Sequence, residues 1–268
     1  MMPVDLVEVR HGESEWNVAM HRSRRGDNSD WTEEFRARHS SSARLTLQGQ
    51  SQPAKAGEWI RENLWGGRFD RCYVSPYVRA TETAGLLQLP DARWYLDIYL
   101  RERDGGVMEQ MNDDERRAAF TRSMELRQAE PFFWTPPNGE SVATTCGRAD
   151  RVLETLHREC SDRRVIMVLH GEMMWGLRVC IERMSPRRYR ELQLSTDPKD
   201  RLHNCQIIHY TRRDPETGRL SKTVDWMRSI NPVDPSTSRN TWEKIVREAY
   251  SNDDLLALAE KYPRMIDK

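Results

Sequence analysis

The stretch VDLVEVRHG, residues 4–12, joins an apolar run to an abrupt polar end. Residues 4–9 are rich in valine and mostly apolar, which favours a buried β-strand. Arg10, His11 and Gly12 follow this run directly. The junction between the predicted strand and these three residues is the first candidate for a functional site.

Four further runs of the same kind occur along the chain, and segments with helical spacing separate them. The runs are RCYVS (71–75), RWYLDIY (93–99), RVIMVLH (164–170) and CQIIHYT (205–211). Strands that alternate with helices in this way are typical of a layered α/β fold. We therefore predict an α/β fold with a mainly parallel central sheet.

Capping residues and apolar spacing predict where several helices begin. The expected helices are 46–64 with Thr46 as N-cap, one from Ser75 with Pro76 in its first position, one capped at Asn112, 141–160, and one following His170. A helical pattern is also expected from Trp242 to about Tyr262.

The chain contains 268 residues, which suits one large domain or two small ones. It has no internal repeats or low-complexity tracts, so we predict one domain over residues 1–230. Polar segments interrupt this domain at about 18–44 and 105–140, and Trp31 and Phe35 are expected to anchor the first. Residues 231–268 are predicted to add a C-terminal loop and helix.

Composition argues against several classes of partner. The formal net charge is zero, so bulk electrostatics favours neither a nucleic acid nor a membrane surface. The five cysteines are scattered without CxxC spacing, which is typical of free thiols in a reducing compartment. No signal-peptide pattern is present, and no apolar run reaches the roughly 18 residues of a membrane span. We expect a cytoplasmic protein.

In an open parallel sheet, functional groups gather beyond the carboxyl ends of the strands. That rule places Arg10, His11, Arg79, Glu102 and His170 on a single rim, with Gly171 directly after the second histidine. Arginines and helix N-termini bind phosphate, a neutral histidine nitrogen can attack phosphorus, and a carboxylic acid can protonate the departing oxygen. Glycines beside the histidines would let the backbone approach the phosphate. The set therefore indicates phosphoryl-transfer chemistry.

Six motifs in order carry a resemblance to a known family. They are RHGES.WN near the start, LTLQGQSQ (45–52), SPYVRATETA (75–84), LRERDGG (100–106), NGESVA (138–143) and VLHGE (168–172). Over roughly residues 4–211 the chain resembles the phosphoglycerate mutase-like branch of the histidine phosphatase superfamily. The resemblance implies a three-layer α/β/α fold, a phosphohistidine intermediate, a small phosphorylated substrate, and neither metal nor other cofactor.

The resemblance also implies a role for each residue that matches a motif. His11 would be the nucleophile, with Arg10, Arg79, His170 and Gly171 around the phosphate. Glu102 would be the general acid/base, although Glu172 could also reach the rim. Asn17 would contact phosphate through its side chain, and Ser14 would either touch phosphate or cap a turn.

Two departures from the cofactor-dependent mutases favour a phosphatase. The segment between Asn17 and Leu45 is longer than theirs and lacks their GW.D phrase, and RDGGVMEQM after Glu102 is closer to a phosphatase pattern. We therefore expect a phosphomonoesterase. Mutase-type phosphoryl transfer and a catalytically weak phospholigand-binding module are the alternatives. The Arg22, Arg24 and Arg25 cluster is either a solvated loop or a site for a second anionic group.

Overall fold

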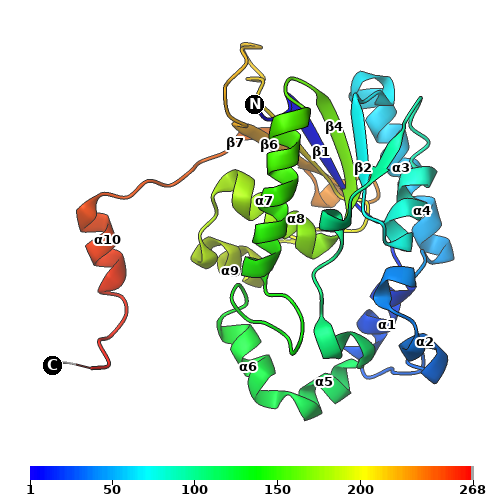
Figure 1. Ribbon diagram of the computed structural model, residues 1–268, viewed down its shortest axis with the longest axis vertical. Coiled ribbons are helices and arrows are strands. Elements are labelled where there is room, and N and C mark those ends of the chain that lie inside the picture. Colours follow the sequence, from blue (N-terminus) through cyan, green and yellow to red (C-terminus); the bar gives the residue numbers. More distant parts are fainter. Residues whose placement is uncertain (267–268) are drawn as a thin grey trace.

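The computed structural model describes residues 1–266 and contains one seven-stranded sheet with helices on both faces (Figure 1). The order of the strands across the sheet is β3-β2-β4-β1-β5-β6-β7. Their bounds are β1 Asp5–Arg10, β2 Arg71–Val74, β3 Trp94–Leu96, β4 Arg164–Leu169, β5 Ile207–Thr211, β6 Trp226–Ile230 and β7 Arg239–Lys244. The first four in spatial order are parallel, and β5, β6 and β7 add antiparallel pairs beside β1.

The predicted α/β class is confirmed, and so is each of the five predicted strands. The sheet is mixed, however, because β5 runs antiparallel to β1 and two strands that we did not predict extend it. The helix expected from Trp242 is wrong over its first part. Trp242 lies in β7, and helix α10, Asn252–Ala259, begins only after its N-cap Ser251.

The side chains of the central strands alternate between two apolar cores, one on each face of the sheet. Leu6 packs with residues of α7 (Val142–Glu159) and α8 (Gly171–Glu182). Its neighbours Val7 and Val9 pack instead with residues of α3 (Leu47–Asn63) and α4 (Val78–Leu86). This alternation, with a helical layer on either side, gives the three-layer architecture its two cores.

Helix α4 begins later than its sequence suggests. We expected Ser75 to be its N-cap, but Tyr77 has that position and Val78 is the first helical residue. The Ser75 hydroxyl accepts a hydrogen bond from the backbone N–H of Tyr77 and lies 2.8 Å from Nε2 of His170. The Ser75 side chain therefore makes its hydrogen bonds at the carboxyl end of β2 and does not cap α4.

The polar segments at 18–44 and 105–140 contain short helices beyond the carboxyl ends of the parallel strands (Figure 1). The short helices of this part of the fold are α1 Glu15–Ser23, α2 Glu33–Ala37, α5 Asp113–Ala119 and α6 Thr121–Ala129, with α9 Pro186–Leu194 nearby in Figure 1. Trp31 is buried among Ala19 and Met20 and contacts Trp16 and Phe35 at ring-centroid distances of 5.4 and 5.5 Å. This aromatic cluster anchors the first segment, as predicted.

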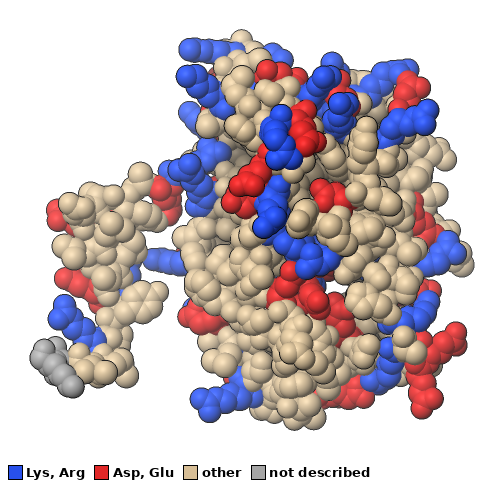
Figure 2. Space-filling view, in the orientation of Figure 1, with Lys and Arg blue, Asp and Glu red and all other residues tan. Residues whose placement is uncertain are grey.

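The composition led us to expect free thiols, no membrane span and a balanced surface charge. All five cysteines are unpaired thiols. Within residues 1–266, no helix combines the length and the apolar character that a bilayer span requires. Basic and acidic side chains are interspersed on the face shown in Figure 2, in keeping with a formal net charge of zero.

Candidate active site

His11 lies directly after β1 and is only 2% exposed. Its Nδ1 is 2.6 Å from the carbonyl oxygen of Gly12, and a carbonyl can only accept, so Nδ1 carries the proton. The guanidinium of Arg79 donates from Nε to Nε2 of His11 at 3.2 Å. Nε2 therefore presents a lone pair toward a cationic group.

The environment of His11 keeps its imidazole neutral. Burial lowers its pKa well below the usual value of 6.5, and the charges of Arg79 and Arg10 lower it further. Loss of hydration is the larger of these two causes. A neutral ring with a free Nε2 is the form that can act as a nucleophile.

His170 follows β4, and its ring centroid is 5.0 Å from that of His11. The Ser75 hydroxyl lies 2.8 Å from Nε2 and can either donate to this nitrogen or accept from it. Nδ1 of His170 is buried without a hydrogen-bond partner in the described chain, and so is Nε of Arg10. Two buried nitrogens at one rim thus have no partner among the described residues, which is rare for polar groups in a protein interior.

Arg10 and Arg79 are each held by one carbonyl oxygen. Nη1 of Arg10 donates to Leu202 at 2.6 Å, and Nη1 of Arg79 donates to Ser40 at 2.6 Å. The guanidinium of Arg79 also lies 5.1 Å from the ring centre of Tyr77, a cation–π distance. Within residues 1–266, neither arginine forms an ion pair with a carboxylate, so both retain charge for an anion.

Glu102 lies on the loop after β3, close to the N-terminus of α8. Its Oε1 accepts hydrogen bonds from the backbone N–H groups of Arg103 at 2.9 Å and Glu172 at 3.2 Å. Burial raises its pKa, and the Glu172 carboxylate raises it further, against opposing effects from Arg79 and Arg10. The Glu172 carboxylate is itself 3.4 Å from Nε of Arg103. Of the two carboxylates, Glu102 is the one without an arginine partner.

A buried ion pair fixes the Glu102 loop, and the sequence did not identify one of its members. Glu140, from the NGES motif, makes a two-bond contact with Arg148 at 2.7 and 2.9 Å. Arg148 also donates to the backbone carbonyls of Tyr99, Arg101 and Glu102. Its only signal in the sequence is its place on the buried face of α7, where an arginine needs a partner.

Ser14 and Asn17 form the turn that leads from His11 into α1. The Ser14 hydroxyl accepts from the backbone N–H of Asn17, and Oδ1 of Asn17 accepts from that of Ser14 at 3.1 Å. Nδ2 of Asn204 donates to Oδ1 of Asn17 and to the carbonyl of His11. The hydroxyl and Oδ1 are thus occupied within a capping box.

The two glycines of the rim have different reasons for lacking a side chain. A Cβ on Gly12 would lie 2.5 Å from the carbonyl oxygen of Gly49, so α3 packs directly on the turn. The N–H of Gly12 donates to the Thr83 hydroxyl at 3.0 Å. A Cβ on Gly171 would face the Arg10 guanidinium at 3.4 Å. Close packing, more than approach to phosphate, explains Gly12.

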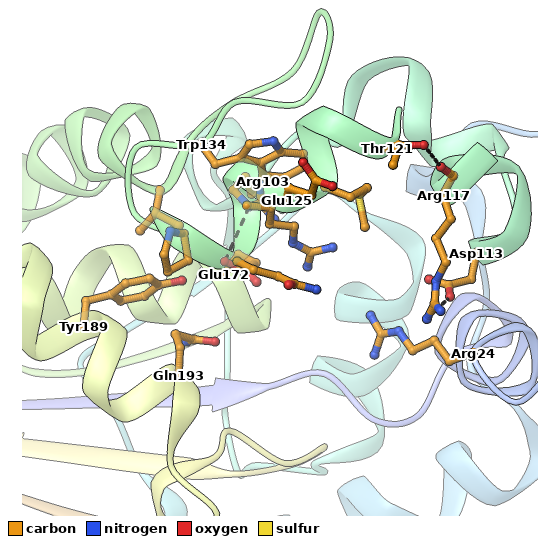
Figure 3. Close-up of a pocket in the computed structure, with 15 residues that line it drawn as sticks. Arg24, Arg103, Asp113, Arg117, Thr121, Glu125, Trp134, Glu172, Tyr189 and Gln193 are labelled. Atoms are coloured by element: carbon orange, nitrogen blue, oxygen red, sulfur yellow. Dashed lines mark hydrogen bonds and ion pairs between the residues drawn. The ribbon is translucent and has the colours of Figure 1, made fainter. Parts of the chain in front are cut away.

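Two adjoining cavities open beside these residues. The smaller, about 260 Å³, is lined by Arg10, Glu102 and Gly171. The larger, about 650 Å³, lies under α5 and α6 and is shown in Figure 3. Glu172 and Gln193 line both, so the larger cavity is an extension of the rim. Within residues 1–266, no group of three or more His, Cys, Asp or Glu side chains is arranged to hold a metal ion.

A family model described as the histidine phosphatase superfamily, branch 1, matches residues 6–221 of this chain. The chain belongs to this superfamily. The 2,3-bisphosphoglycerate-dependent phosphoglycerate mutase of Azorhizobium caulinodans is 30% identical over 197 residues, which cover 71% of this chain and 87% of that protein. The resemblance stated from the motifs is confirmed at the level of the family.

Solved structures with the same fold include several phosphatases. A mycobacterial glucosyl-3-phosphoglycerate phosphatase complexed with VO3 has a TM-score of 0.59 at 21% identity, over 77% of this chain and 92% of that chain. A phosphoserine phosphatase of Entamoeba histolytica, in complex with 3-phosphoglyceric acid, has a TM-score of 0.57 at 22% identity, over 78% and 90%. The family includes both phosphatases and mutases, and related structures bind small phosphorylated molecules.

Proposed function

We propose that this protein is a metal-independent phosphomonoesterase that acts through a phosphohistidine on His11, with Glu102 as general acid and base. The observation that carries the proposal is a pair of buried nitrogens without a partner among the described residues, Nε of Arg10 and Nδ1 of His170, beside an unprotonated Nε2 of His11. A phosphate placed among them would accept a hydrogen bond from each, with the His170 proton on Nδ1 and the Ser75 hydroxyl donating to Nε2. The positive charge of Arg79 would also attract this phosphate.

In the first step, Nε2 of His11 attacks phosphorus as the bond from phosphorus to the ester oxygen breaks. The proton on Glu102 passes to the departing oxygen, and an alcohol leaves. Arg10, Arg79 and His170 hold the three remaining phosphoryl oxygens and stabilise the negative charge of the transition state. The hydrogen bond from Nδ1 to Gly12 favours the phosphorylated ring, which retains that proton.

In the second step, water attacks phosphorus and the bond from Nε2 to phosphorus breaks. The Glu102 carboxylate takes the proton of the attacking water, so phosphate leaves and the enzyme returns to its initial state. The raised pKa of Glu102, caused by burial and by Glu172, supports the acid role, because the proton is retained above the usual value of 4.5. The same group then serves both half-reactions.

We favour hydrolysis over mutase activity because the cavity beside Arg10 and Glu102 has solvent-exposed residues in its wall. The smaller cavity at Arg10 and Glu102 has the exposed side chains of Gln193 and Arg201 in its outer wall. The departures from the mutase motifs near Asn17 and after Glu102 support the same conclusion. Phosphoglycerate mutase activity is the second candidate, because a mutase is 30% identical to this chain.

The test is hydrolysis of para-nitrophenyl phosphate by the purified protein, with and without EDTA. We expect turnover that is unchanged by EDTA, a phosphoenzyme labile to acid, and loss of both in His11→Ala. Wild-type turnover in the alanine variant, or loss with EDTA and rescue by a divalent ion, would refute the proposal. Conversion of 3- to 2-phosphoglycerate that is faster than hydrolysis would identify a mutase instead.

A further inference from the structure

The larger cavity has two facing walls (Figure 3). On one side, Arg103 and Glu172 point inward beneath the Trp134 ring, near the smaller cavity at the rim. On the other side, Arg24 at the end of α1 and Arg117 of α5 face the same space. The cavity therefore extends from the catalytic rim to the first polar segment.

The arginines that line this cavity are only partly neutralised. Arg117 pairs with Asp113 at 2.7 Å, and Arg103 lies 3.4 Å from Glu172. The side chains of Arg24 and Arg127 make neither a hydrogen bond nor an ion pair with the described residues, 1–266. The remaining lining carboxylate, Glu125, is exposed. The cavity thus contains two arginines whose charges are not matched locally.

Arg127 is held in place without a carboxylate. Its guanidinium lies 5.3 Å from the ring centre of Trp134, whose other cation–π neighbour is Arg103 at 5.9 Å. The indole Nε1–H is fixed by a 3.0 Å bond to the Ser123 hydroxyl. The Trp134 ring therefore positions Arg127 while leaving its N–H groups available to a ligand.

The fields of these arginines overlap. Burial lowers the pKa of Arg127, the charges of Arg103 and Arg24 lower it further, and the Glu172 carboxylate opposes them. The lining contains four arginines and three carboxylates, so a bound anion would relieve the remaining repulsion.

We propose that the Arg24–Arg127 cavity is a distal anion subsite, which selects phosphomonoesters that carry a second anionic group. This proposal rests on the proposed function, since the first phosphate is taken to bind at Arg10, His11 and His170. Glu172 and Gln193 line both cavities, so the substrate would extend past them from the rim. The first polar segment contributes one arginine of its cluster, because Arg22 instead pairs with Asp30 at 2.9 Å.

The size of the cavity restricts the substrate further. At about 650 Å³ it falls within the roughly 300–1,000 Å³ typical of pockets for drug-sized ligands. A three-carbon phosphate would leave much of this space unfilled. The geometry therefore points to a body of sugar size or larger, with phosphate or carboxylate at its far end.

The test compares binding of fructose 1,6-bisphosphate and fructose 6-phosphate by calorimetry. The His11→Ala protein is used as background, so that turnover does not enter. Arg24→Gln and Arg127→Gln together should weaken binding of the bisphosphate by about 10-fold or more, since charge-assisted hydrogen bonds are lost. Binding of the monophosphate should change by less than about 2-fold, within the range for exposed charges.

Matched controls are Arg25→Gln and Arg122→Gln. Both arginines are exposed, belong to the same two segments, and lie outside the cavity lining. Equal weakening by this pair, equal effects on both ligands, or no effect on either would overturn the subsite. Failure of the proposed function would be seen separately, as absence of para-nitrophenyl phosphate hydrolysis by protein with native His11.

Discussion

Glu102→Gln is the substitution that most directly tests the acid in the proposed mechanism. The side chain accepts two backbone hydrogen bonds, from Arg103 at 2.9 Å and Glu172 at 3.2 Å. A glutamine carbonyl oxygen can accept both, so the loop should keep its conformation. The variant then lacks only the transferable proton and the negative charge.

The size of the effect depends on how much the leaving group needs that proton. General acid catalysis contributes roughly 10²–10⁴-fold, or about 2.7–5.4 kcal/mol of barrier at 25 °C. For an alkyl phosphate such as glycerol 2-phosphate, we expect kcat/KM of Glu102→Gln to fall within this range. For para-nitrophenyl phosphate, whose phenolate leaves readily, the loss should be less than about 10-fold.

The pH profile gives a second readout of the same proton. The pKa of Glu102 is raised by burial and by Glu172, so its acid form persists above the usual value of 4.5. Activity on the alkyl phosphate should therefore decrease as the pH rises through this raised value. Glu102→Gln should lack that decrease, because an amide does not titrate.

Glu172→Gln is the matched control, since Glu172 is the neighbouring carboxylate in the same cavity. We expect it to produce a smaller difference between alkyl and aryl substrates than Glu102→Gln does, because its carboxylate faces Arg103 and acts on the acid only by raising the pKa of Glu102. If Glu172→Gln produced the difference between leaving groups and Glu102→Gln did not, the assignment of the acid would be refuted. Equal losses with both substrates in Glu102→Gln would refute it as well.

Two further predictions concern buried charges away from the reacting atoms. Arg148→Met breaks the pair with Glu140 and should lower the free energy of unfolding, measured in urea, by about 3–5 kcal/mol. Arg158→Met, on the exposed side of the same helix, should change it by less than about 0.5 kcal/mol. Equal changes in the two variants would show that the pair does not fix the loop. Glu8 is buried on β1, and neither of its carboxylate oxygens has a hydrogen-bond partner among the described residues. Burial raises the pKa of Glu8 well above 4.5 in the folded protein, so the stability that the protonated form provides is lost as the pH rises through this raised pKa. Glu8→Gln should accordingly raise the melting temperature more at pH 8 than at pH 5, and a difference independent of pH, as expected for exposed Glu62→Gln, would contradict this assignment.

The candidate site at the carboxyl ends of the strands could be predicted from the sequence, because its position follows from the order and direction of three strands alone. Once β1, β2 and β4 are known to be parallel neighbours, their carboxyl ends must meet. His11 and His170 therefore come together although 159 positions separate them in the sequence, and their ring centroids are 5.0 Å apart. Apolar strands of this kind have only one place in the fold, at the centre of the sheet.

The antiparallel edge could not be predicted in the same way. The sequence WMRSI of β6 contains two polar residues, and Trp242 is the only apolar residue of RNTWEK in β7. Their strand conformation depends on the pairing of β6 with β5 and of β7 with β6. WEKIVREAY has apolar residues at helical spacing, which predicted a helix, but Trp242 packs against the buried His209 at 4.8 Å. Tertiary contacts therefore decided the conformation of a segment whose local pattern was ambiguous.

The role of Ser75 was missed for a related reason. Ser-Pro before an apolar pattern is a strong helix start, and only the position of His170, 95 residues later, explains why the hydroxyl is used elsewhere. Arg148 likewise gave no signal beyond its charge on a buried face. Groups that act through a neighbour distant in sequence require the tertiary structure to be identified.

The two polar segments are joined to each other beside the strand rim, and their contacts reach Arg79. Arg36 of the first segment pairs with Glu115 of the second at 2.7 Å. The Ser40 hydroxyl donates to Glu109 at 2.6 Å, while the Ser40 carbonyl accepts from Arg79 at 2.6 Å. The position of Arg79, which contacts His11, therefore depends on a serine that is held by contacts to both segments. The strands fix where His11 and His170 lie, and the joined segments fix the direction of the Arg79 side chain.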